Sequence, residues 1–191
     1  MFAALLSLSF SRMKRASRNR RSGMPVWSPM RENGGSFSMV LPILRYEEGF
    51  RSSPYYCSEG YPTIGYGHLC STTKWDSLST CPSYISKSDA EQLLIEEVNA
   101  KTGSMSYYSN IMAAYNACGD RRKAILVSMA FQLGTEGLSY FQNTLRLISQ
   151  RRWDDAAEAM LDSAWARQTP NRAQRHAEVM RSNTCAEYGW Y

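Results

Sequence analysis

Three residues between positions 48 and 63 have side chains and spacings suited to bond cleavage. Eight residues separate Glu48 from Cys57, and five separate Cys57 from Thr63. If the intervening residues form a hairpin, Thr63 returns close to Cys57 and both face Glu48. A carboxyl group in such a partly desolvated notch holds its proton more tightly and can serve as a general acid. A solvated glutamate at a helix end is the alternative that these residues leave open.

The flanking residues predict the elements that would position these side chains. Residues 39–48 carry apolar side chains at helical spacing, and Gly49 follows them as a stop signal. Segments 50–57 and 61–68 are rich in aromatic and β-branched residues on either side of a Ser-Glu-Gly turn, which predicts a β-hairpin. The candidate acid would therefore lie where a short helix meets a hairpin.

Helical patterns dominate the chain after the hairpin. Ser86 is a candidate N-cap for a long helix, with Asp89 three residues on. Further helices are expected around residues 109–117, 120–132, 141–150, 153–162 and 170–181. The predicted fold class is α+β, with a small β-hairpin lobe joined by a long helix to an all-helical lobe. Two lobes joined in this way leave a cleft, which is a usual site for ligands.

The net charge of +5 is concentrated at the N-terminus. Residues 1–40 hold seven basic residues and one acidic residue, whereas the rest of the chain holds 15 basic and 16 acidic residues. A nucleic-acid-binding domain would carry its basic residues on the folded body, so that class is excluded. We interpret residues 1–39 as a basic, disordered arm that could bind anionic polymers, and residues 40–191 as the folded domain. The apolar run after Met1 is short and precedes the basic residues, so no cleavable signal peptide is expected.

The cysteines and histidines indicate neither a metal site nor a cofactor. Five cysteines leave at least one thiol unpaired within a monomer, and no Cys-X-X-Cys pair occurs. Two histidines, His68 and His176, are too few for a zinc site with ordinary spacing.

The segment LRYEEGFRSSPYYCSEGYPTIGYGHL, residues 44–69, resembles the signature of phage-type lysozymes, glycoside hydrolase family 24. That family has a glutamate, eight residues, an aspartate or cysteine, five residues, and a threonine. The similarity continues through MAFQLGTEGLSYFQNTLRLI, RRWDDAAEAML and WARQTPNRAQR, and it covers about residues 40–190. The resemblance implies a lysozyme-like fold and cleavage of the β-1,4 bond between N-acetylmuramic acid and N-acetylglucosamine in peptidoglycan.

The resemblance also implies roles for individual residues. Glu48 would be the general acid, Thr63 would help to position the attacking water, and Arg172 would pair with Glu48. Ala159 replaces an asparagine that contacts substrate in the T-even phage enzyme, so fine substrate preference is open. Three further residues match substrate-contacting positions: Leu69, Phe131 and Thr144.

Cys57 departs from the aspartate of the T-even phage enzyme, although the family includes cysteine variants. A carboxylate there acts as a base or stabilises a positive transition state. Most of a cysteine is neutral thiol at pH 7. Cys57 therefore orients water, becomes a thiolate or attacks the sugar, and inversion and retention both stay open.

Under the resemblance, several residues are structural. His68 would form an ion pair with Glu97, which we favour over catalysis by the histidine. A disulfide between Cys57 and a neighbour, which would inactivate the enzyme until reduced, is the less favoured pattern. Four cysteines are disulfide candidates, Cys70 with Cys81 and Cys118 with Cys185, which would leave Cys57 free.

These features predict a bacteriolytic endolysin. We expect a monomer that resides in the host cytoplasm before lysis, reaches the periplasm through a holin, and acts on peptidoglycan. The basic arm would contact anionic outer-membrane or wall polymers. The alternatives are a catalytically inactive relative that binds peptidoglycan or forms part of a virion, and a lytic transglycosylase.

Overall fold

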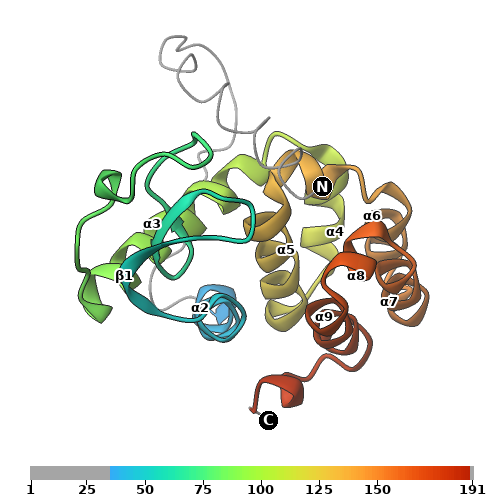
Figure 1. Ribbon diagram of the computed structural model, residues 1–191. Coiled ribbons are helices and arrows are strands. Elements are labelled where there is room, and N and C mark those ends of the chain that lie inside the picture. The colour runs from blue at the N-terminus through green and yellow to red at the C-terminus, as the bar shows by residue number, and fades with distance from the viewer. Residues whose placement is uncertain (1–34, 190–191) are drawn as a thin grey trace, which may run out of the picture.

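A small antiparallel sheet and a larger set of helices make up the computed structural model, which describes residues 35–189 (Figure 1). The α+β class is therefore confirmed. The prediction for the N-terminal arm lies, for residues 1–34, outside the described residues. The helices are α2 Gly35–Glu48, α3 Lys87–Met105, α4 Ser109–Ala117, α5 Asp120–Ser139, α6 Gln142–Ser149, α7 Trp153–Leu161, α8 Ala164–Gln168 and α9 Pro170–Ser182. The strands are β1 Arg51–Tyr56, β2 Pro62–Gly65 and β3 His68–Leu69, and two 3-10 turns are η2 Leu78–Thr80 and η3 Ala186–Tyr188.

Helix α2 is longer than the sequence pattern indicates. It begins at Gly35, four residues before the predicted start, and it contains Pro42 in its interior. Its end is as predicted, because Gly49 takes a φ of 67° and donates its backbone N–H to the carbonyl oxygen of Arg45. The glycine stop places Glu48 at the last position of the helix, facing the start of β1.

The predicted hairpin is present, with a third short strand added to it. Strands β1 and β2 pair antiparallel, and β2 also pairs with β3, so β2 is the central strand. Thr63 lies opposite Tyr55 on one side and opposite Leu69 on the other. Strand β3 was not predicted because two residues are too few to show a period-two pattern.

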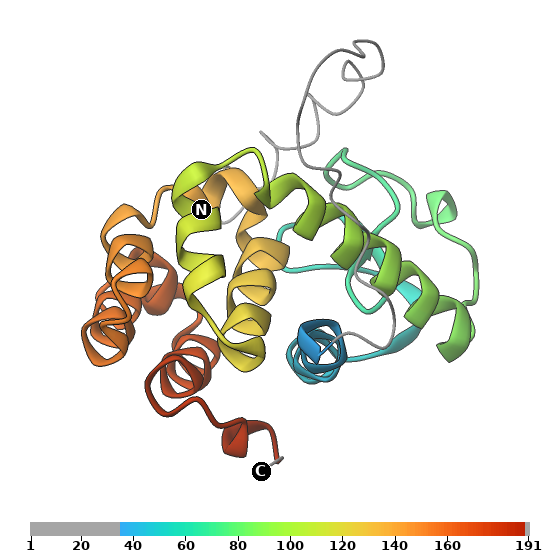
Figure 2. The same ribbon diagram turned by 180° about the vertical axis from the view of Figure 1, so that it is seen from behind.

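Helix α3 connects the two lobes, running along the sheet and into the helical lobe (Figure 2). The predicted cap is confirmed, since the Ser86 side chain accepts a hydrogen bond from the backbone N–H of Asp89. The buried face of α3 carries Ala90, Leu94 and Val98, which pack into the common core.

Helix α5 is the central element of the helical lobe and contacts α2, α3, α4 and α9. Its side chains from Ala124 to Ala130 are almost wholly buried, as its apolar sequence predicts. Helical geometry breaks at Gly134, where φ is 76°, so the chain turns two residues after the predicted end at 132. Helix α8 was missed because five residues give no readable periodicity. No helix within residues 35–189 is both long and apolar enough to span a membrane.

Candidate active site

Glu48 is held by Arg172, as the sequence resemblance implies. Arg172 lies in the first turn of α9, two residues after Pro170, which is favoured at a helix start. Its Nη1 atom donates to Glu48 Oε1 at 2.8 Å, and the two side chains are 8% and 21% exposed. The other carboxylate oxygen, Oε2, faces Gly67: a Cβ at that position would lie 3.4 Å from it. The glycine, at a φ of 81°, keeps this side of the carboxylate open.

Cys57 and Thr63 are tied to one backbone carbonyl of the hairpin. The Thr63 hydroxyl donates to the carbonyl oxygen of Tyr61 at 2.8 Å, and the backbone N–H of Cys57 donates to the same oxygen at 3.0 Å. Thr63 is buried, whereas Cys57 is half-buried and carries a free thiol. The turn thus fixes the two residues relative to each other, as the hairpin prediction requires.

Tyr55 belongs to the same neighbourhood and was missed at the sequence level. It lies opposite Thr63 in the sheet. Burial raises the pKa of its phenol; the nearby charge of Arg51 lowers it, and those of Glu48 and Cys57 raise it further. The phenol therefore shares one electrostatic environment with Glu48 and Cys57. The sequence signal that could have identified Tyr55 is its position in the predicted hairpin, opposite Thr63 on the neighbouring strand.

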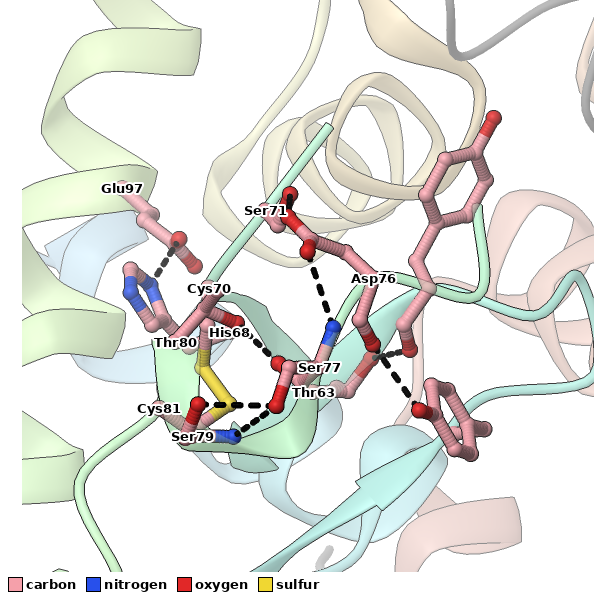
Figure 3. Close-up of a disulfide and its surroundings, with 12 residues drawn as sticks. Thr63, His68, Cys70, Ser71, Asp76, Ser77, Ser79, Thr80, Cys81 and Glu97 are labelled. Atoms are coloured by element: carbon pink, nitrogen blue, oxygen red, sulfur yellow. Dashed lines mark hydrogen bonds and ion pairs between the residues drawn. A yellow bond between two sulfur atoms is a disulfide. The ribbon is translucent and has the colours of Figure 1, made fainter. Parts of the chain in front are cut away.

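His68 forms the predicted pair with Glu97. Its Nδ1 lies 2.8 Å from Glu97 Oε1 (Figure 3). The hydrogen bond from His68 to the Glu97 carboxylate is the main reason why the pKa of His68 is raised, while desolvation opposes it. The pair joins β3 to α3, so its evident role is to hold the sheet against the connecting helix.

The disulfide between Cys70 and Cys81 is present and closes the loop after β3 (Figure 3). Inside the loop, the Asp76 carboxylate accepts hydrogen bonds from the Ser71 hydroxyl at 2.6 Å and the Ser77 backbone N–H at 2.8 Å. The disulfide and this carboxylate brace a loop that starts one residue after Leu69.

The predicted disulfide between Cys118 and Cys185 is wrong, since both are free, buried thiols. The two regions do touch, because Arg122 donates to the carbonyl oxygens of Met180 and Arg181. Each sulfur, however, has its own basic neighbours on α5: Arg122 and Lys123 for Cys118, and Arg121 for Cys185. Burial raises the pKa of Cys118 to about 11 and also raises that of Cys185, so neither thiol is ionised for attack on a partner.

The three predicted substrate-contacting residues are distributed over different elements. Leu69 pairs with Thr63 in the sheet, and Phe131 lies half-buried on α5 against the core. Thr144 lines a pocket of about 380 Å³ between the end of α5, the start of α6 and helix α8, with Ala159 of α7 and Trp165 of α8 in its wall. Figures 1 and 2 place these helices across α5 from the sheet. Thr144 is thus separated from the hairpin residues, and Phe131 does not line this pocket.

A second carboxylate, Glu47, is buried next to Glu48 and fully paired. Arg175 donates to it from Nε at 2.9 Å and from Nη2 at 2.6 Å, and the Tyr188 hydroxyl donates to Oε1 at 2.7 Å. The Glu47 side chain is only 3% exposed. Hydrogen bonding to Glu47 is the main cause of the raised pKa of Arg175, whereas burial is the main cause for Tyr188. This pairing fixes the end of α2 to α9.

Two further polar residues connect the Glu47 and Glu48 pairs inside the core. Arg172 Nη2 donates to Ser128 Oγ at 3.0 Å, and His176 Nε2 lies 2.8 Å from the same oxygen. On its other side, His176 Nδ1 lies 2.8 Å from the Tyr188 hydroxyl. Ser128 and His176 are both fully buried. The sequence did not reveal this connection, because Ser128 and His176 are 48 residues apart along the chain and Glu47 and Tyr188 are 141 apart.

Hydrogen bonds hold the candidate site together, from Arg172 to Glu48 and from Thr63 and Cys57 to the Tyr61 carbonyl oxygen. Within residues 35–189, no three His, Cys, Asp or Glu side chains form a group that could hold a metal ion. The arrangement offers a carboxyl group open on one side, a buried hydroxyl and a half-buried thiol. These groups can donate a proton, orient water and supply a base or nucleophile.

Comparisons with known proteins match the part of the chain that holds these residues. A family model described as phage lysozyme matches residues 45–181, a span that includes Glu48, Cys57, Thr63 and Arg172. Two Dictyostelium discoideum proteins, probable T4-type lysozymes 1 and 2, are 29% and 30% identical over 167 residues, which is 79% of this chain and 98% of each relative. The pre-baseplate central spike protein Gp5 of Enterobacteria phage T4 is 28% identical over 165 residues, 78% of this chain but 29% of Gp5.

Proposed function

This chain belongs to the phage lysozyme family, and we propose that it is a muramidase that hydrolyses the β-1,4 bond between N-acetylmuramic acid and N-acetylglucosamine in peptidoglycan. Family membership supports a muramidase-like glycoside hydrolase. The observation that carries the finer proposal is Glu48, held at Oε1 by Arg172 while Oε2 faces Gly67. A carboxyl group fixed by one oxygen can present the other to a leaving group.

In the proposed reaction, Glu48 donates its proton to the glycosidic oxygen as the bond to the anomeric carbon breaks. Thr63 and Cys57 lie on the hairpin, where they can position water for attack on that carbon. The water delivers hydroxide to the sugar and gives up its second proton to a base. If Cys57 instead attacks the carbon, a thioglycoside forms first and water then releases it, which gives retention rather than inversion.

The proposal is tested with purified peptidoglycan. The wild type is expected to reduce the turbidity of the suspension, whereas Glu48→Gln, which keeps the shape and loses the acid, is expected to lose activity by at least about 100-fold. A wild type that folds but leaves turbidity unchanged would contradict a hydrolase. Equal clearing by both proteins would remove Glu48 from the role of acid.

The role of Cys57 is separated by a series at one position. If Cys57→Asp retains activity while Cys57→Ser and Cys57→Ala lose it, the side chain acts as an ion or nucleophile. A serine variant close to wild type would assign it to water positioning. NMR of the anomeric configuration of the newly formed product distinguishes inversion from retention.

A role as a virion component is the second candidate, because one relative is the central spike protein Gp5. The match covers 29% of that protein, so the likeness concerns one part of it. A virion component and a free endolysin can share the same muramidase activity, and they differ in whether the protein co-purifies with intact particles. A lytic transglycosylase would leave an anhydro-sugar end, which mass spectrometry of the products detects.

For the biological setting we propose an endolysin that acts on the periplasmic wall after a holin releases it from the host cytoplasm. The charge of residues 1–40 supports a contact between the N-terminal arm and anionic outer-membrane or wall polymers. Because α2 begins at Gly35, the test deletes residues 1–34 and leaves the helix whole. The deletion should weaken killing of intact cells while activity on purified walls is kept. Equal loss in both assays would refute a role for the arm.

A further inference from the structure

We propose that His176 is a positioning residue which, through Ser128, limits Arg172 to a single hydrogen bond with Glu48. The inference rests on the proposed function, because it concerns the acid of the same site. The observation behind it is the continuous buried chain from Arg172 through Ser128, His176 and Tyr188 to Glu47.

The direction of each hydrogen bond in this chain follows from counting protons. The Tyr188 hydroxyl has one proton and donates it to the Glu47 carboxylate, which can only accept. Its contact with His176 Nδ1 must therefore be one in which Nδ1 carries a proton and donates. At the other end, Arg172 has only donors, so Ser128 Oγ accepts from it.

The remaining contact depends on the charge of His176. The ring is fully buried, with Trp165 and Tyr188 rings packed edge-on against it. Desolvation is the largest cause of its strongly lowered pKa, followed by the positive charges of Arg172 and Arg175, while the carbonyl of Arg172 opposes the shift. Glu47 lies 3.9 Å from Nδ1, but Arg175 already pairs with that carboxylate.

A neutral ring protonated at Nδ1 has a bare Nε2, so Nε2 accepts the Ser128 hydroxyl proton. That leaves the lone pairs of Ser128 Oγ directed toward Arg172 Nη2 at 3.0 Å. Every donor from Arg172 to Glu47 then points the same way along the chain. An imidazolium would instead donate from Nε2, so the Ser128 oxygen would have to accept from both His176 and Arg172, and its own proton would lose Nε2 as an acceptor.

The consequence concerns the second arm of the Arg172 guanidinium. Arginine commonly binds a carboxylate through two parallel hydrogen bonds, and such a pair strongly favours the ionised form. Here only Nη1 reaches Glu48, because Nη2 donates to the Ser128 hydroxyl at 3.0 Å and, in a longer contact of 3.4 Å, to the Ser128 backbone carbonyl. The neutral His176 thus leaves Glu48 oriented while its second oxygen stays free to hold the proton that catalysis needs.

The wild-type protein provides the first test. A two-dimensional ¹H–¹⁵N spectrum of the histidine rings identifies which ring nitrogen carries the proton. We expect His176 to be neutral and protonated at Nδ1 from about pH 5 to pH 8, independently of any enzymatic activity. A ring protonated at Nε2, or an imidazolium in this range, would overturn the hydrogen-bond order and the proposal with it.

The second test uses the pH dependence of peptidoglycan clearing. Ser128→Ala, His176→Val and Tyr188→Phe should each move the alkaline limit of activity to lower pH, by about 0.5–1 unit for the first two, because Arg172 can then turn both arms toward Glu48. If His176 acts through Ser128, the double variant should match Ser128→Ala alone. Additive shifts, or an unchanged limit in all three single variants, would refute the proposal.

Val179→Ala is the matched control for loss of core packing. Val179 is buried on the same helix as His176, but its side chain takes no part in the series of hydrogen bonds from Arg172 to Glu47. This variant should lower thermal stability and leave the alkaline limit in place. If His176→Val does not fold, Ser128→Ala and Tyr188→Phe still decide the outcome. A wild type without clearing activity would refute the proposed function, whereas the spectrum would still test the hydrogen-bond order.

Discussion

Reduction of the Cys70–Cys81 disulfide should lower stability by an amount set by the short loop that it closes. The two cysteines are 11 residues apart, so the closed loop holds about 12 residues. The chain-entropy relation gives about 2.8 kcal/mol for a loop of this length. For a domain of this size, 1 kcal/mol corresponds to about 2–4 °C in melting temperature. We therefore expect a decrease of about 6–11 °C.

The assay compares thermal unfolding of one protein with and without reductant, so that no side chain differs between the samples. The double variant Cys70→Ser/Cys81→Ala should melt close to the reduced wild type and should not respond to reductant. The hydrogen bonds of Asp76 stay in the reduced loop. Residual order in that loop would bring the decrease in melting temperature toward the lower end of the expected range.

Counting thiols adds an independent check. Without reductant, the unfolded protein should show three reactive thiols, those of Cys57, Cys118 and Cys185. In the folded protein Cys57 should react first, because it is half-buried while the other two are buried. A decrease of less than 1 °C in melting temperature on reduction would refute the loop argument. A count of one reactive thiol would show that Cys118 and Cys185 form a disulfide after all.

Three further perturbations follow from single contacts. Glu97→Gln should lower the pKa of His68. In the wild type, the stability gained from the His68–Glu97 pair should be complete below about pH 6.5 and should disappear as the pH rises through the raised pKa of His68. Melting temperature measured against pH follows this loss. Gly60→Ala should destabilise the protein by about 1–3 kcal/mol in urea unfolding, because a Cβ would lie 2.7 Å from the Trp75 ring at a φ of 83°. Ser86→Ala should cost about 1 kcal/mol in the same assay, because the α3 cap is lost.

Matched variants identify the cause of each effect. Glu96→Gln is exposed one residue along α3 and should leave the His68 titration unchanged. Gly119→Ala meets no atom within 4 Å and should cost less than about 1 kcal/mol. An unchanged His68 titration in Glu97→Gln, a Gly60→Ala variant as stable as Gly119→Ala, or full stability in Ser86→Ala would contradict the corresponding contact.

The sequence was most informative where position is set by neighbouring residues. A glycine stop placed Glu48 at a helix end, and a turn brought Cys57 and Thr63 to one carbonyl oxygen. These arrangements depend on a few backbone angles within about 16 residues, so the glycine stop and the hairpin pattern predict them. The Ser86 cap was readable for the same reason.

Long-range pairing was predicted unevenly, and only through resemblance to a family. The contacts Glu48–Arg172 and His68–Glu97 were correct because family spacing specifies them. Cys118–Cys185 was wrong although the regions touch, because a disulfide requires two sulfurs in contact while arginine side chains reach the same space.

The sequence alone therefore determined the α+β class, the place of Glu48 at a helix end and the place of Cys57 and Thr63 on a hairpin, since hairpins and helix ends are formed by adjacent residues. The tertiary structure alone decided which buried polar groups meet. Glu47 accepts a hydrogen bond from Tyr188, 141 positions away, and Ser128 is hydrogen-bonded to His176, 48 positions away. Neither residue type nor periodicity marks such partners, because a buried donor is satisfied by whichever acceptor the packing of α2, α5, α9 and η3 brings within 3 Å.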